Sequence, residues 1–154
     1  MMEKPVSFES LLVPVDFSAS SAAAFQHALE LAAGENKVII LLHAIDPAYV
    51  QFAVDHDFGS AAEVIERMKA RAMEQLQDWK SRVARDVEVD IVVSEGIPFL
   101  EILRKAEDFI VDAVVMGKIG TRGRVEQLLF GSTAEKVLRG STRPVLTLPH
   151  DTSS

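Results

Sequence analysis

Hydrophobic residues along the chain gather in short runs, and longer segments that mix apolar and polar residues separate these runs. The runs at residues 10–15 and 37–45 are almost continuously apolar, which is typical of strands covered on both faces of a parallel sheet. The run at 87–93 alternates before it becomes apolar, and this pattern also predicts a strand. Shorter runs at 113–116 and 144–148 predict two more strands, and the proline that opens the last one suits a strand start or a sheet edge.

The segments between these strands carry apolar residues at helical spacing. The first of them has two candidate N-caps, Ser18 and Ser20, whose hydroxyls can accept from the free N–H groups of a helix start. Residues 48–59 show no clear period and predict an irregular segment. The predicted helices cover residues 18–33, 61–83, 98–108 and 132–138.

Strands and helices therefore alternate along the chain. Strict alternation predicts an α/β fold with an open, five-stranded parallel sheet and helices on both faces, a Rossmann-like nucleotide-binding architecture. We expect the strand order 3-2-1-4-5. The length of 154 residues suits a single domain over residues 1–154, with loosely ordered ends at about 1–8 and 150–154.

Composition narrows the classes of function. The chain has 16 Lys and Arg against 23 Asp and Glu, a net charge of −7, which argues against general binding to nucleic acid or to an anionic membrane. It has no cysteine, so disulfides and cysteine-based metal or redox chemistry are excluded. Its apolar runs are far shorter than a membrane span, and its start lacks the apolar segment of a signal peptide. We therefore expect a soluble, cytoplasmic protein.

Candidate binding residues follow the ends of several predicted strands. In parallel sheets, ligands bind at the carboxyl ends of the strands, near the point where the strand order reverses. Asp16, residues 44–46 and residues 117–132 all come directly after a predicted strand. We expect these three segments to converge on one crevice.

The third segment lies in the stretch MGKIGTRGRVEQLLFGS, which holds four glycines and three basic residues and leads into a predicted helix. Glycine lets the backbone approach a ligand closely, successive N–H groups can bind an anion, and a helix N-terminus adds free N–H donors. These features suit the phosphates of a nucleotide. The alternative is a solvated surface loop followed by a helix with a serine cap. The stretch is neither a Walker loop nor a dinucleotide fingerprint.

Three stretches also carry a family resemblance. They are LLVPVDFSASSAAAFQHALELA, VIILLHAID and VVMGKIGTRGRVEQLLFGSTAEKVLRGSTRPVLTLP. They resemble the first strand and helix, the second strand and the C-terminal signature of a universal stress protein of the single-domain kind. The ATP-binding branch of that family carries Gly-x2-Gly-x9-Gly-Ser/Thr. Gly117, Gly120, Gly131 and Ser132 match this motif, but ten residues lie between Gly120 and Gly131 instead of nine.

The resemblance implies a binding role for residues at the strand ends and in the glycine loop. One group would surround the adenine, with Asp16 facing it and Ala44 offering backbone atoms: Pro14, Val15, Asp16 and Ala44. A second group would flank the nucleoside: Met116 and Gly117. A third group would hold the phosphates: Gly120, Gly131, Ser132, Thr133 and Ala134. The family often has a threonine or serine where Ala134 stands, so a hydroxyl is missing here while the backbone N–H remains.

The resemblance further implies an ATP-binding regulatory protein of the stress response that acts as a nucleotide-dependent homodimer. The dimer would pair through the final strand, residues 144–148, and an unidentified protein partner would read its state. AMP and ADP are the alternative nucleotides, and Mg²⁺ would accompany ATP. Two other functions stay open: an interaction protein of the same fold without nucleotide, and a slow ATPase.

Two features that contain histidine have competing interpretations. His43 lies late in the second predicted strand, where a buried or half-buried histidine with a satisfied partner is favoured over a catalytic base. Asp55, His56 and Asp57 suggest a metal cluster, but adjacent residues on an irregular segment seldom converge on one ion. No pattern of paired carboxylates, nucleophile and histidine, or metal ligands stands out for catalysis.

Overall fold

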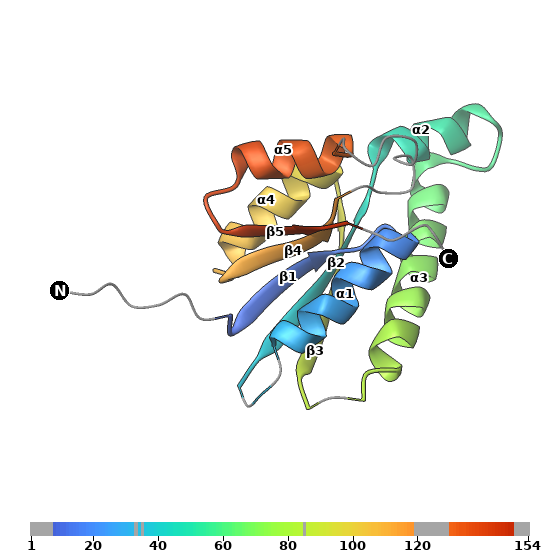
Figure 1. Cartoon of the computed structure of the whole chain (residues 1–154). Coiled ribbons are helices and arrows are strands. Elements are labelled where there is room, and N and C mark those ends of the chain that lie inside the picture. The colour runs from blue at the N-terminus through green and yellow to red at the C-terminus, as the bar shows by residue number, and fades with distance from the viewer. Residues whose placement is uncertain (1–7, 33, 35, 85, 119–129, 150–154) are drawn as a thin grey trace.

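A computed structural model describes residues 8–32, 34, 36–84, 86–118 and 130–149 of the chain. Strands and helices alternate as the sequence predicts, with one additional helix (Figure 1). The strands are β1 (Ser10–Pro14), β2 (Val38–Ile45), β3 (Glu88–Glu95), β4 (Ala113–Gly117) and β5 (Val145–Leu148). The helices are α1 (Ala19–Leu31), α2 (Pro47–Asp55), α3 (Ala61–Ser81), α4 (Pro98–Asp108) and α5 (Ser132–Gly140). The chain ends that were predicted to be loose lie almost wholly outside the described residues.

The strands form one parallel sheet in the order β3-β2-β1-β4-β5. This confirms the predicted Rossmann-like α/β fold and its strand order. The chain moves outward from β1 to β3, then returns to add β4 on the other side of β1. The carboxyl ends of β1 and β4 therefore mark the point where the strand order reverses, which is where ligands bind in open α/β sheets.

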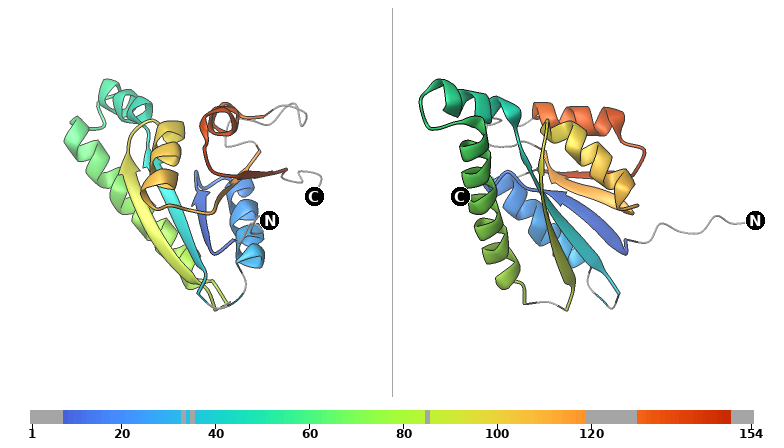
Figure 2. Two further views of the ribbon diagram at one scale, coloured as in Figure 1. Left: turned by 90° about the vertical axis from the view of Figure 1, so that its left-hand side faces the viewer. Right: turned by 180° about the vertical axis from the view of Figure 1, so that it is seen from behind.

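Helices cover both faces of this sheet (Figure 2). Side chains alternate along a strand, so Leu11 and Val13 of β1 enter one core while Leu12 enters the other. The first core lies under α1 and α3, with Phe25 and Leu76 buried in it. The second core lies under α4 and α5, and its members from these helices are Ile102, Ala106, Ala134 and Val137.

The helix α2 corrects one prediction. Residues 48–59 were predicted to be irregular, yet Pro47–Asp55 is helical. Asp46 accepts a hydrogen bond from the Ala48 N–H at 2.9 Å and Pro47 occupies the first helical turn, a pairing that starts helices. The sequence interpretation took this Asp-Pro pair only as the end of a strand. Tertiary packing completes the helix, because Val50 is buried against Ile45 and Val64.

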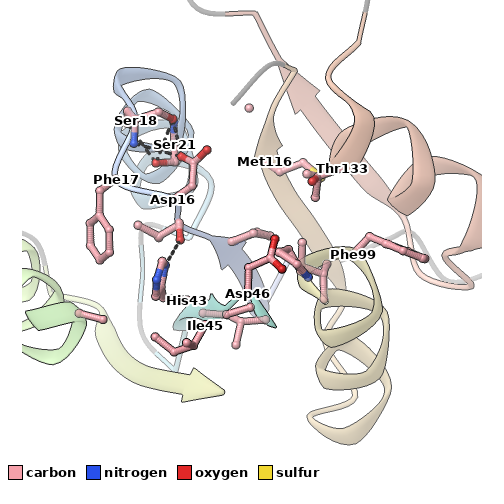
Figure 3. Close-up of a pocket in the computed structure, with 18 of the residues that line it drawn as sticks. Asp16, Phe17, Ser18, Ser21, His43, Ile45, Asp46, Phe99, Met116 and Thr133 are labelled. Carbon is pink, nitrogen blue, oxygen red and sulfur yellow. Dashed lines mark hydrogen bonds between the residues drawn. The ribbon is translucent and has the colours of Figure 1, made fainter. Parts of the chain in front are cut away.

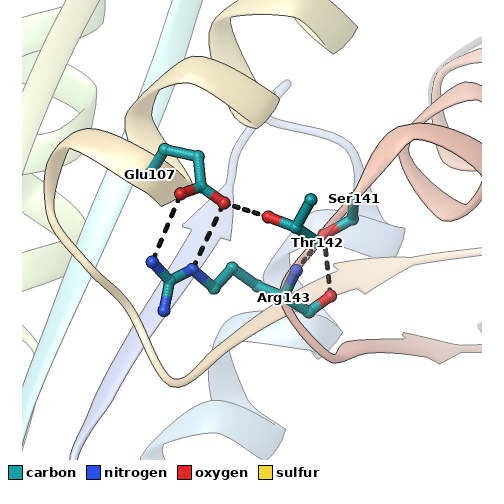
Figure 4. A network of polar contacts seen from close by, with 4 residues as sticks. All are labelled: Glu107, Ser141, Thr142 and Arg143. Atoms are coloured by element: carbon teal, nitrogen blue, oxygen red, sulfur yellow. Dashed lines mark hydrogen bonds and ion pairs between the residues drawn. The ribbon is translucent and has the colours of Figure 1, made fainter.

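A polar clamp joins α4 to the turn before β5 (Figure 4). Glu107, near the end of α4, accepts hydrogen bonds from the Thr142 hydroxyl and from the Arg143 guanidinium, whose Nε and Nη2 lie 3.3 Å from its two oxygens. The bond from Thr142, followed by those from Arg143, lowers the pKa of Glu107 below its ordinary value. The clamp fixes the C-terminal end of α5 relative to α4.

No helix within the described ranges is both long enough and apolar enough to cross a membrane.

Candidate ligand-binding cleft

A cleft of about 570 Å³ opens at the carboxyl ends of β1, β2 and β4 (Figure 3). It is walled by the starts of α1, α2, α4 and α5 and by the middle of α3. All the predicted site residues that the structure describes line it: Pro14, Val15, Asp16, Ala44, Met116, Gly117, Gly131, Ser132, Thr133 and Ala134. Gly120 lies outside the described residues, as does the extra residue between it and Gly131.

The turn between β1 and α1 forms one wall. Ser18 caps α1 by accepting from the Ser21 N–H at 3.1 Å. The Asp16 carboxylate accepts in turn from the Ser18 N–H at 3.0 Å and from the Ser18 hydroxyl. Asp16 therefore does not cap α1 itself, but it stabilises Ser18, the residue that does. Its side chain is exposed at the cleft, so a contact with ligand remains compatible with this structural role.

Between Asp16 and Ser18, the backbone of Phe17 has a φ of 63°, in the left-handed region that bulky residues rarely adopt. Its ring packs on the His43 ring, with centroids 4.8 Å apart, and edge-on against Trp79 at 5.7 Å. Trp79 stacks on the buried Phe25 at 5.9 Å. These contacts hold the turn in its strained conformation, since such strain persists only where the surroundings determine it.

His43 is half-buried and has a hydrogen-bond partner, as the sequence interpretation favoured. Its Nδ1 lies 2.7 Å from the Val15 carbonyl oxygen. It also lines the cleft, which the sequence alone did not indicate.

The start of α5 forms the opposite wall. Its N-cap is Gly131, and no side chain caps the helix within the described part of the chain. The predicted alternative of a serine cap is wrong, because Ser132 is already the first helical residue. Thr133 is half-buried and Ala134 is buried. The free N–H groups of the first turn therefore lie at the end of the helix that lines the cleft. The positive end of the helix dipole lies there too.

Gly117, at the end of β4, has a steric role that its sequence context did not show. A Cβ atom at this position would lie 2.0 Å from the Ser20 Oγ and 3.0 Å from the Ser20 Cβ. Real Cβ atoms do not approach other atoms so closely, so any side chain at this position would force Ser20 and the start of α1 to shift away from β4. The hydroxyl of Ser20 is buried there without a hydrogen-bond partner among the described residues.

The wall that α2 and α3 supply was missed by the sequence interpretation. Tyr49 comes from α2, and Met68, Arg71 and Gln75 come from α3. The spacing of these three residues, three and then four positions apart, places them on one helix face. That spacing was the sequence signal that could have identified this wall. Because residues 48–59 were predicted to be irregular, we expected no cleft beside this face of α3.

Charge is distributed over several elements of the cleft. Asp16 and Asp46 place carboxylates at the ends of β1 and β2, while Arg71 from α3 and Lys136 from α5 contribute cations. The Lys136 ammonium lies 4.9 Å from the centre of the Phe99 ring, a cation–π contact that holds it beside the start of α4.

The suggested metal cluster at residues 55–57 lies away from this cleft, at the end of α2. The His56 Nδ1 lies 2.8 Å from the Phe52 carbonyl oxygen, and its ring stacks on Phe52 at 4.1 Å. The Asp55 carboxylate accepts from the Gln51 amide at 2.8 Å. Across the described residues no group of three or more His, Cys, Asp or Glu side chains is arranged to hold a metal ion.

The fold and the cleft define a class: a Rossmann-like α/β protein with a ligand cleft where its strand order reverses. The family model for the universal stress protein family matches residues 7–149. The chain therefore belongs to the universal stress protein family.

Two curated relatives match over nearly their full length. The universal stress protein MJ0577 of Methanocaldococcus jannaschii is 27% identical over 161 residues, which cover 96% of this chain and 99% of that protein. The universal stress protein YxiE of Bacillus subtilis is 28% identical over 148 residues, covering 90% of this chain and 97% of that protein.

Solved structures share the fold. The structure of MJ0577 superposes with a TM-score of 0.84 at 28% identity, covering 96% of this chain and all of that one. A universal stress protein solved in complex with cAMP superposes with a TM-score of 0.60 at 24% identity, covering 94% of this chain and 99% of that one. At this identity the second likeness shows the fold alone.

Proposed function

We propose that this protein binds an adenine nucleotide, with ATP as its ligand, and acts as a nucleotide-dependent regulatory module in the stress response. The observation that carries the proposal is the convergence in the cleft. Residues from the ends of β1, β2 and β4 and from the start of α5, far apart in sequence, line one cavity of about 570 Å³. That volume falls within the usual range for small-molecule sites, roughly 300–1,000 Å³.

The two ends of the cleft suit the two ends of a nucleotide. The phosphates would lie at the start of α5, where Gly131 admits close approach and the N–H groups of Ser132, Thr133 and Ala134 can donate to them. The base would lie between Asp16 and Ala44, beside apolar groups such as Val15 and Met116. The protein solved with cAMP supports this proposal, because there a member of the same fold holds an adenine nucleotide.

Mg²⁺ would enter with ATP as the counter-ion of its phosphates, and AMP and ADP would occupy the same base end. We propose that the module acts in the cytoplasm, where ATP is available. Its nucleotide-bound state would be read by a protein partner, because a ligand that favours one conformation shifts the population towards it.

We further propose that the protein is a homodimer paired through β5. This strand is an edge of the sheet, and Leu146 in its middle is 38% exposed. An unpaired edge with an exposed apolar side chain is open to pairing with another strand. Light scattering at micromolar concentration should give the mass of two chains, and the mass of one chain would contradict the proposal.

Calorimetry with ATP and Mg²⁺ tests the central claim. We expect saturable heat and an increase in the unfolding temperature that grows with ATP concentration. Absence of both at millimolar ATP would leave a partner-binding protein of the same fold. Phosphate release, followed in the same samples, distinguishes binding from slow hydrolysis, and sustained turnover would identify an ATPase.

A further inference from the structure

We propose that His43 selects the base of the nucleotide, its Nε2 accepting a hydrogen bond from the exocyclic amino group of a 6-aminopurine. This inference rests on the proposed function and names a specificity residue within the same cleft. His43 lies late in β2 and lines the cleft, next in sequence to Ala44, whose backbone atoms the proposed function places at the edge of the base.

The hydrogen bond to Val15 decides the tautomer of His43. Its Nδ1 lies 2.7 Å from the Val15 carbonyl oxygen. A carbonyl oxygen only accepts hydrogen bonds, so Nδ1 must carry the proton. In the neutral ring, Nε2 then has a free lone pair and acts as an acceptor. His43 lines the cleft, and we infer that Nε2, whose lone pair the bond to Val15 does not use, is the atom that meets the ligand.

The ring is also held in orientation. Phe17 packs on it with centroids 4.8 Å apart and planes inclined by 42°, and Phe17 is itself fixed by Trp79. Turning the ring over would place carbon against the Val15 carbonyl and lose a short hydrogen bond. The position of the Nε2 lone pair is therefore determined before any ligand binds, which is the condition for selective recognition.

Asp16 and Asp46 add carboxylate oxygens to the lining of the cleft, which can accept from a ligand's N–H donors, while Arg71 and Gln75 of α3 can donate to its acceptor atoms. A 6-aminopurine presents N–H donors to His43. A 6-oxopurine presents a carbonyl oxygen there, so two lone pairs would face each other, and such a mismatch is how sites reject the wrong ligand.

The test compares triphosphates that differ at position 6 of the purine. Calorimetry at pH 8 would use ATP, purine riboside triphosphate, which lacks the amino group, and inosine triphosphate, which has a carbonyl. One hydrogen bond contributes about 0.5–1.5 kcal/mol, so we expect ATP to bind roughly 3- to 10-fold more tightly than purine riboside triphosphate, and inosine triphosphate to bind most weakly.

The variant His43→Asn separates the two roles of the ring. An asparagine amide nitrogen can replace Nδ1 as the donor to Val15, but nothing replaces Nε2. The readout is the ratio of two affinities measured on the same variant, and we expect the preference for ATP over purine riboside triphosphate to fall below about twofold. An unchanged preference in a folded His43→Asn protein would overturn the inference.

A second measurement needs no variant. In the wild-type protein with ¹⁵N-labelled histidine, ATP should shift the Nε2 resonance of His43 in the direction of an accepted hydrogen bond, and purine riboside triphosphate should not. Equal shifts with both ligands would overturn the inference even if ATP binds. Failure of every nucleotide to bind would instead overturn the proposed function, and this inference with it.

Discussion

The starts of α1 and α5 face each other across the cleft and differ in how their first turns are satisfied. At α1, Ser18 accepts from the Ser21 N–H and the Asp16 carboxylate accepts from Ser18. At α5, the N-cap is Gly131, which has no side chain that could accept from the first-turn N–H groups. The start of α1 is therefore stabilised by side chains of the protein itself. The first-turn N–H groups of α5 have no side-chain acceptor among the described residues and can donate to a ligand.

The difference indicates that the start of α1 serves mainly stability and the start of α5 serves mainly binding. A capped helix start contributes to stability, because its donors are already satisfied in the free protein. An uncapped start contributes less to stability and can hold an anion. Changes at α1 should therefore act mainly on stability, and changes at α5 mainly on affinity.

The largest effect is expected from Gly131→Asp. An aspartate at this N-cap would accept from the first-turn N–H groups and place a negative charge where the phosphates should bind. Hydrogen bonds to charged groups are worth about 1.5–3 kcal/mol, so calorimetry should show a roughly 10- to 100-fold weaker binding of ATP. The far-ultraviolet circular dichroism should stay native. Because Gly131→Ser adds a cap without charge, it should lose less affinity, and wild-type affinity in Gly131→Asp would show that the phosphate end is misplaced.

Next in size is Gly117→Ala, which should act on the wall that α1 forms. The new Cβ atom would lie 2.0 Å from the Ser20 Oγ, and overpacking of this kind typically costs about 1–3 kcal/mol. Chemical denaturation should therefore show a lower free energy of unfolding.

A matched control is Gly140→Ala at the end of α5, where the new Cβ atom would meet only the tip of the Leu103 side chain, at 2.8 Å. Leu103 can move, so this change should cost less. Adding Ser20→Ala to Gly117→Ala should restore part of the stability, and equal losses in both alanine variants would contradict the steric role of Gly117.

A smaller effect is expected from Ser18→Ala, which removes the cap of α1. Loss of such a cap costs about 1 kcal/mol, or roughly 2–4 °C in the unfolding temperature of a domain of this size. Ser60→Ala, which removes the corresponding cap of α3 at a residue that does not line the cleft, should cost about as much. The affinity for ATP should change less than about threefold in either variant. A large loss of affinity in Ser18→Ala alone would mean that α1 also binds the ligand.

The smallest effect concerns the clamp that fixes the far end of α5. The pKa of Glu107 is lowered in the folded protein by Thr142 and then by Arg143. Its contribution to stability is therefore present above the ordinary carboxyl pKa and is lost as the pH falls through the lowered value. Urea midpoints of the wild type and Glu107→Gln should differ slightly at pH 7, and the difference should close as the pH falls through the lowered pKa of Glu107. A difference that is independent of pH would mean that the charge of Glu107 contributes nothing.

Much of the fold could be predicted from the sequence, because its strands and helices differ in local pattern. Buried parallel strands read as apolar runs, and the helices read as amphipathic segments, so the element order and most bounds agree with the structure to within two residues. The exception is α2, a short helix with a single buried side chain, Val50. Its apolar period was too weak to identify, although Asp46 and Pro47 marked its start.

The candidate site was predictable where it follows strand ends. Asp16, Ala44 and Gly117 reach one cleft because parallel strands end at the same edge of a sheet. The wall made by Arg71 and Gln75 was not predictable in this way. That wall depends on where α3 crosses the sheet. Side-chain packing decides this crossing, and it does not follow from where a strand ends in the sequence.

The sequence by itself determined the alternation of strands and helices, the glycine-rich segment after β4 and the family that the chain resembles. These properties depend on residues that are near neighbours along the chain. Only the tertiary structure decided which ring nitrogen of His43 carries the proton, why a side chain at position 117 would meet Ser20, and that the start of α5 has no side-chain cap among the described residues. Val15 lies 28 positions from His43, and Ser20 lies 97 positions from Gly117 along the chain. Such pairs meet only when the sheet assembles, so no local pattern encodes their contact.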